Sequence, residues 1–295
     1  MKKSLPEWFG IVWEEHNYLP DTYYDDLLKP YVFEGKDDLE IFADELGSDF
    51  SKRNVLELGC GTGRATEVFR SHSGGEKLTL LDLSETMISA VQEKFQSGDV
   101  EFVCSDSLQF LKNNTATFDY VYSLWSLSHS IHQTIENFEL LDGYAHVEEI
   151  LEKFIRESIV SQGELFLLHF DSRSEEQTIL MRQWSKMIRH CPDESSQSHS
   201  FSILNNVFQR LQAKGIVEYS VEHLKGEPIL YENIDVAVET FVNFHLEGAV
   251  QRLQNHESAM EIISSVDKYL RGFMNNDGTV SVAPGCFVFR LKKMV

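Results

Sequence analysis

The sequence predicts an α/β protein whose parallel sheet is covered by helices on both faces. From residue 54 onward, short apolar segments typical of buried strands alternate with longer segments of helical periodicity. A glycine-rich loop follows the first apolar segment, at the point where such a sheet passes from strand to helix. The alternation and the loop together favour a single doubly wound domain over residues 1–295.

The elements of the sheet follow one another at regular spacing. The run Asn54-Val55-Leu56-Glu57-Leu58 is apolar enough for a buried strand, and a helix over 64–72 begins directly after the glycine loop. The next expected strands are 77–81, 100–104, 120–122 and 163–170, with connecting helices over 84–96 and 146–161. Crossovers of this length join parallel strands.

The remainder of the chain is less regular. A helix is expected over 174–189, followed by a polar loop over 191–200. An apolar stripe that begins at Phe201 and stops before Gly215 indicates another helix, and Val217, Tyr219 and Val221 alternate as in a half-exposed strand. Two helices over 235–255 and 258–273 and a strand over 285–292 complete the expected elements.

The first 50 residues predict a helical cap that is rich in aromatic side chains. Pro20 and Pro30 divide this segment into short helices, and an amphipathic stretch over 37–46 ends at Gly47. The start of the chain lacks the apolar stretch of a secretory signal, and no apolar run reaches the roughly 20 residues that span a bilayer. A cytoplasmic location is therefore expected.

Composition narrows the class of partner. The net charge is −21, from 47 acidic and 26 basic residues, so most of the surface should repel the phosphates of a nucleic acid. The negative field would favour cationic partners, although acidity for solubility alone explains it equally well. The four cysteines form no CxxC pair, so neither a metal site nor a disulfide scaffold is expected.

The glycine loop carries the strongest functional signal. Gly59, Gly61 and Gly63 have no Cβ, so the backbone can turn sharply there and approach a ligand closely. A nicotinamide-binding loop would need G-x-G-x-x-G/A, but Arg64 or Thr66 stands at the third glycine position, depending on where the count starts.

The pattern E-x-G-x-G-x-G over residues 57–63 instead resembles the first motif of the class I, seven-stranded, Rossmann-like S-adenosylmethionine-dependent methyltransferases of the small-molecule type. Three further landmarks occur in the order of that family. They are Leu81-Asp82, Cys104-Ser105-Asp106-Ser107, and the strand Phe118-Asp119-Tyr120-Val121-Tyr122-Ser123-Leu124-Trp125. The resemblance covers about residues 50–171.

The resemblance implies a fold and a set of cofactor contacts. It implies a seven-stranded, mostly parallel sheet with the last strand antiparallel, N-terminal helices, and helical lid insertions over 172–200 and 228–276. S-adenosyl-L-methionine is the implied cofactor and S-adenosyl-L-homocysteine its product. The residues implied to bind it are Tyr24, Glu57, Gly59, Gly61, Gly63, Asp82, Leu83, Met87, Asp106, Ser107, Ser123 and Leu124. Tyr18 and Tyr23 are alternatives to Tyr24, and all three tyrosines could equally serve only to pack the cap.

Three residues near the expected substrate are candidates for catalysis. His129 falls where many relatives carry a histidine beside the transfer site, and His132 is the second candidate for a general base. Either histidine could equally anchor its loop by hydrogen bonds. Asp171 could bind a substrate ammonium group or cap the helix that follows it.

The function implied is methyl transfer to a nitrogen or oxygen of a small molecule, with the acidic surface and Asp171 favouring an amine. Methylation of a peptide or protein is the alternative within the enzyme class, and it would need an open acidic groove. A non-catalytic cofactor-binding subunit is the alternative outside it. Nucleic acid and membrane partners are not expected, and the sequence leaves monomer and homodimer open.

Overall fold

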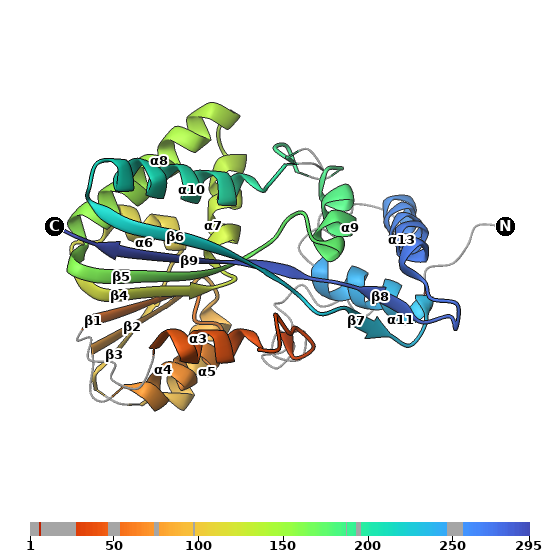
Figure 1. Ribbon diagram of the computed structural model, residues 1–295, viewed down its shortest axis with the longest axis horizontal. Coiled ribbons are helices and arrows are strands. Elements are labelled where there is room, and N and C mark those ends of the chain that lie inside the picture. Colours follow the sequence, from red (N-terminus) through yellow and green to blue (C-terminus); the bar gives the residue numbers. More distant parts are fainter. Residues whose placement is uncertain are drawn as a thin grey trace.

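The computed structural model describes residues 28–46, 54–73, 77–96, 98–186, 188–192, 196–246 and 256–295, together with Pro6. Its centre is a seven-stranded sheet with the strand order β3-β2-β1-β4-β5-β9-β6. Helices cover both faces of the sheet, and a second lobe extends from the end of the sheet where the parallel strands have their carboxyl ends (Figure 1).

Seven strands form this sheet: β1 (Asn54–Leu58), β2 (Lys77–Asp82), β3 (Val100–Cys104), β4 (Phe118–Leu124), β5 (Ile159–Phe170), β6 (Val217–Lys225) and β9 (Gly285–Lys293). The neighbours from β3 to β5 pair in parallel. β9 inserts between β5 and β6 and is antiparallel to both. The expected doubly wound, mostly parallel sheet with an antiparallel last strand is confirmed.

Each face of the sheet has its own helices and its own core. α3 (Asp38–Leu46), α4 (Arg64–His72) and α5 (Glu85–Lys94) cover one face, and α6 (Ser107–Asn113), α7 (Leu127–Glu136), α8 (Leu140–Glu157) and α10 (His199–Ala213) cover the other (Figure 1). Side chains alternate along each strand, so Tyr120 and Tyr122 of β4 enter the first core and Val121 enters the second.

The second lobe lies beyond the carboxyl ends of the parallel strands (Figure 1). It contains α9 (Glu175–Trp184), a two-stranded sheet of β7 (Ile229–Tyr231) and β8 (Val280–Val282), α11 (Ile234–Thr240), a π-helical turn (Phe241–His245), α13 (His256–Leu270) and a 3₁₀ turn (Arg271–Phe273). Its buried side chains are continuous with the core beneath α3 and α4. The two lobes therefore share one hydrophobic core.

The expected division into a cap over 1–50 and insertions over 172–200 and 228–276 stays a prediction. α9 falls within the first insertion, and β7, α11 and α13 fall within the second. Of the expected cap, the structure describes residues 28–46 and Pro6. In the parts of the chain that it describes, no helix is long and apolar enough to cross a membrane.

The structure also contains elements that the sequence did not indicate. α7 was not predicted because Ser126, Ser128 and Ser130 are weak helix formers, yet Leu127 and Ile131 anchor this helix in the core. The expected helix over 235–255 instead passes into the π-helical turn after Thr240. The short strands β7 and β8 were missed because three residues are too few to show a periodicity.

The core between β9 and α10 is expected to contribute much of the stability. Phe289 is fully buried, and its ring contacts the rings of Phe208 and Tyr219. Phe289→Ala should lower the free energy of unfolding by about 3–5 kcal/mol, measured by urea denaturation, because it leaves a cavity. Val221 pairs with Phe289 across the sheet but is 39% exposed, so Val221→Ala should cost less than about 1 kcal/mol. Equal losses would contradict this assignment of the core.

Candidate functional site

The glycine loop joins β1 to α4 through three left-handed backbone conformations. The φ angles of Gly59, Gly61 and Gly63 are 77°, 50° and 90°, a region that glycine adopts without steric cost. A Cβ on Gly59 would lie 1.9 Å from the Ser126 hydroxyl, so the loop packs tightly there. A Cβ on Gly61 would meet no atom within 4 Å. The backbone at Gly61 therefore faces open space that a ligand can approach.

Asp82 ends β2 and holds the glycine loop from the side. One carboxylate oxygen accepts a hydrogen bond from the Gly61 N–H at 2.9 Å, and the other accepts one from the Ser84 N–H at 2.9 Å. Burial raises the pKa of Asp82, and these backbone hydrogen bonds oppose the shift. A carboxylate has about four lone-pair sites, so Asp82 can also accept from the hydroxyl of a ligand. Next to it, Leu83 is 49% exposed.

Asp106 and Ser107 stand at the end of β3, at the same edge of the sheet. Asp106 caps α6 by accepting from the Gln109 N–H, and its second oxygen accepts from the Ser130 hydroxyl at 2.5 Å. Ser107 is buried, and so is Met87 on α5. Asp106 is thus held rigidly beside the end of β2.

Glu57 lies beneath the glycine loop, away from solvent. The Thr66 and Tyr122 hydroxyls donate to one of its oxygens at 2.6 and 2.7 Å, which joins β1 to α4 and β4. Burial is the main cause that raises the pKa of Glu57 to about 8, although both hydrogen bonds lower it. The implied contact between Glu57 and the cofactor's amino group stays a prediction.

Ser123 and Leu124 end β4 next to the glycine loop. The Ser123 hydroxyl donates to the Leu58 carbonyl at 2.8 Å and accepts from the Leu127 N–H at 3.3 Å, so it ties β4 to β1 and to the start of α7. Leu124 is partly buried against the first core. Tyr24, Tyr23 and Tyr18 lie outside the described residues.

These residues fit an adenosine-containing ligand that carries a polar amino-acid end. The open backbone at Gly61, the carboxylate of Asp82 and the exposed Leu83 meet at one edge of the sheet, as such a ligand requires. The individual contacts stay predictions. Among the described residues, no group of three or more His, Cys, Asp or Glu side chains is arranged to hold a metal ion.

His129 and His132 lie on consecutive turns of α7, but in different surroundings. His129 is exposed to solvent yet surrounded by many protein atoms, and this desolvation lowers the pKa of its imidazole. His132 is more deeply placed, and desolvation lowers its pKa to about 3. Its Nε2 lies 3.1 Å from the Ser200 hydroxyl. Of the two, His129 is the more exposed, and a role in catalysis stays a prediction for both.

The same serine hydroxyl also binds His169 of β5. His169 Nδ1 donates to the Phe170 carbonyl at 2.7 Å, so in the neutral ring Nε2 accepts from Ser200 at 2.8 Å. Ser200 has one proton to donate, which leaves His132 as a donor to it. Desolvation is the main cause that lowers the pKa of His169 to about 4. This buried chain of hydrogen bonds therefore connects α7, β5 and α10 through neutral imidazoles.

Asp171 organises the loop that follows β5. One of its oxygens accepts from the Arg173 N–H at 2.9 Å and from the Gln197 amide at 3.1 Å, and the other accepts from His223 Nε2 at 2.8 Å. The N-cap of α9 is Ser174, so Asp171 does not cap that helix through its side chain. A contact between Asp171 and a substrate ammonium group stays a prediction.

Two residues of this edge, His223 and Asp38, were missed by sequence reasoning. His223 of β6 is partly exposed beside Asp171, and alternation along the strand was the only signal for it. Asp38 of α3 accepts hydrogen bonds from Arg64 and Trp125, an arrangement without any local signature. Trp125 itself, with φ 69°, adopts a backbone conformation that is uncommon for a bulky residue.

Comparison with known proteins shows that this part of the chain is similar to methyltransferases. A family model described as "Methyltransferase domain" matches residues 55–141, which include the glycine loop, Asp82, Asp106 and His129. The chain is 25% identical over 183 residues to YqeM of Bacillus subtilis, covering 48% of this chain and 73% of that protein.

A second relative is malonyl-[acyl-carrier protein] O-methyltransferase 2 of Ilyobacter polytropus, 24% identical over 226 residues, which covers 67% of this chain and 85% of the relative. The alignments to other proteins named malonyl-[acyl-carrier protein] O-methyltransferase cover less of those proteins, down to 20% of their length. The solved structure of YcgJ from Bacillus subtilis superposes with a TM-score of 0.52 at 14% identity, covering 87% of this chain and 98% of that one. This last likeness shows the fold alone.

The open space at Gly61 gives a test of the loop. Gly61→Ala should leave the chain folded but lower its affinity for S-adenosylhomocysteine at least tenfold, measured by calorimetry, because the added methyl enters the space a ligand needs. Gly215 is the matched control, since its φ is 69° and a Cβ there also meets no atom within 4 Å. Both variants should lose about 1–2 kcal/mol of stability through backbone strain. Equal affinity in both would contradict ligand binding at Gly61.

Proposed function

We propose that this chain, as a class I S-adenosylmethionine-dependent methyltransferase, methylates a nitrogen or oxygen of a small molecule. The acceptor would lie between the carboxyl edge of the sheet and the second lobe. His129 would be the residue that takes up a proton from it.

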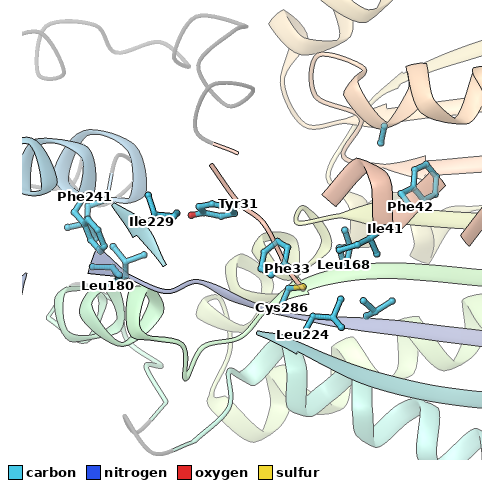
Figure 2. Packing of buried hydrophobic residues seen from close by; sticks show 14 of the residues in the cluster. Tyr31, Phe33, Ile41, Phe42, Leu168, Leu180, Leu224, Ile229, Phe241 and Cys286 are labelled. Carbon is cyan, nitrogen blue, oxygen red and sulfur yellow. The ribbon is translucent and has the colours of Figure 1, made fainter. Parts of the chain in front are cut away.

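The observation that carries the proposal is that the second lobe lies beyond the carboxyl ends of the parallel strands, where it can cover an acceptor (Figure 1). Tyr31 and Phe33 pack against Trp125, with ring centroids 6.4 and 5.8 Å apart, in a core that continues into the second lobe. Figure 2 displays this core around Tyr31 and Phe33. Such a cover suits a small acceptor that is enclosed away from water. Methylation of a protein segment would favour an open groove instead.

The residues of the edge have separable tasks in this mechanism. When bound, S-adenosylmethionine supplies a methyl group on a sulfonium, already activated toward displacement. The Gly61 backbone and Asp82 would hold the cofactor, so the chain's main contribution is to align an acceptor lone pair with the transferred carbon. The lowered pKa of His129 keeps its imidazole neutral near pH 7, so it can accept the acceptor's proton.

A carboxylate acceptor is a second candidate, because several matched relatives are named as O-methyltransferases of a malonyl group on acyl-carrier protein. A carboxylate is already deprotonated near neutral pH and needs no general base. His129 would then be dispensable for chemistry, so its substitution separates this candidate from the first.

Asp82 provides the test of the cofactor site. A ligand present at a hundredfold excess over its Kd stabilises the folded state by about 2.7 kcal/mol, and Asp82→Ala should remove most of the resulting rise in Tm with S-adenosylhomocysteine. Asp119 is the matched control, because its carboxylate accepts from the Asn54 N–H at the opposite edge of the sheet. An undiminished shift in Asp82→Ala would exclude Asp82 as a ligand.

His129→Gln provides the test of the acceptor class. With amines and phenols as acceptors, kcat should fall by about 10²–10⁴-fold, because glutamine cannot take up a proton. In the wild type, kcat should also fall as the pH drops through the His129 pKa, which lies below 6.5. A panel of carboxylic acids serves as the comparison. Turnover of carboxylates that survives the substitution favours the second candidate, and no product from either panel would sink the proposal.

A further inference from the structure

A buried carboxylate joins three segments that are distant in the sequence. Asp38 of α3 is completely buried, and its two oxygens accept from the Arg64 guanidinium at 2.9 and 3.1 Å. One of the oxygens also accepts from the Trp125 indole N–H at 2.9 Å. A buried charge is costly unless it is paired and hydrogen-bonded, so the three side chains hold one another in a fixed arrangement.

Two of these contacts reach the cofactor loop. Arg64 is the first residue of α4 and directly follows Gly63 of the loop. The backbone of Trp125 has φ 69°, and its backbone N–H donates to the Leu168 carbonyl at 3.0 Å. This conformation directs the next residue, Ser126, against Gly59. Asp38 therefore fixes the loop from both sides without lying in it.

The segment that carries Asp38 also contacts the second lobe. We call residues 28–46 the N-terminal strap. Its Tyr31 donates to Glu176 of α9 at 2.5 Å, and its Val32 carbonyl accepts from the Glu227 N–H at 2.7 Å, just before β7. In Figure 2, Tyr31 and Phe33 lie between side chains of the second lobe and side chains of the sheet. The strap thus connects the expected acceptor-binding lobe to the cofactor loop.

We propose that Asp38 is a positioning residue, which transmits the docking of the N-terminal strap on the second lobe to the loop that binds the cofactor. Contacts made at α9 strengthen cofactor binding mainly through Asp38 and its partners Arg64 and Trp125, beside a direct ring contact between Tyr31 and Trp125. The two binding sites are consequently coupled, and by linkage a bound acceptor that orders the second lobe raises the affinity for the cofactor. The inference does not depend on whether the acceptor is an amine, a hydroxyl or a carboxylate.

The experiment is a double-mutant cycle on the affinity for S-adenosylhomocysteine, with no acceptor present. Tyr31→Phe removes the hydrogen bond to Glu176, and Asp38→Leu removes all three bonds to the carboxylate. We expect Tyr31→Phe to raise Kd about fivefold or more in the wild-type background and by less than about twofold in Asp38→Leu, because the route through the carboxylate is then lost. Asp38→Leu alone should raise Kd at least tenfold, with faster dissociation in stopped-flow measurements.

A control separates positioning from loss of stability. Leu211 of α10 is fully buried in the other core, so Leu211→Ala should lower Tm without changing the affinity for S-adenosylhomocysteine. If Asp38→Leu does not fold, Trp125→Phe takes its place in the cycle, since this variant keeps an aromatic ring but loses the indole N–H that donates to Asp38. Trp125→Phe should raise Kd several-fold and reduce the effect of Tyr31→Phe, although the Arg64–Asp38 pair remains. Additive effects in either cycle, or an unchanged Kd in Asp38→Leu, would overturn the proposal.

Discussion

The structure depends on the close approach of two turns at the carboxyl edge of the sheet, the glycine loop after β1 and the turn after β4. Gly59 and Ser126 lie so close together that no side chain on Gly59 fits between them. Both turns reach this contact through left-handed backbone conformations, Gly59 at no steric cost and Trp125 against its preference. The residues predicted to bind the cofactor are arranged around this contact.

Three acidic side chains stabilise the contact from different directions. Glu57 joins the strand beneath the loop to α4 and β4, Asp82 holds the loop from the neighbouring strand, and Asp38 holds it from the N-terminal strap. Each of these side chains exchanges hydrogen bonds to water for hydrogen bonds to the protein. Because these bonds are directional, they specify one arrangement more strongly than apolar packing would.

The histidines of the edge show how burial separates similar residues. His129 remains accessible on α7, whereas His132 and His169 share the hydroxyl of Ser200 inside the protein. All three have lowered pKa values because desolvation disfavours the charged ring. A neutral imidazole therefore prevails throughout this region, and exposure alone distinguishes the residue that can meet a substrate.

The sequence by itself determined the alternating strands and helices, the parallel sheet and the glycine loop, because these follow from local periodicity and from residues without a Cβ. It also placed Asp82, Asp106 and His129 at one edge, since parallel strands bring their carboxyl ends together. Only the tertiary structure decided that Glu57 faces inward, that His132 is sequestered, and that Asp38 pairs with Arg64 and Trp125. Those partners lie 9 to 87 positions apart in the chain, and packing alone selects them.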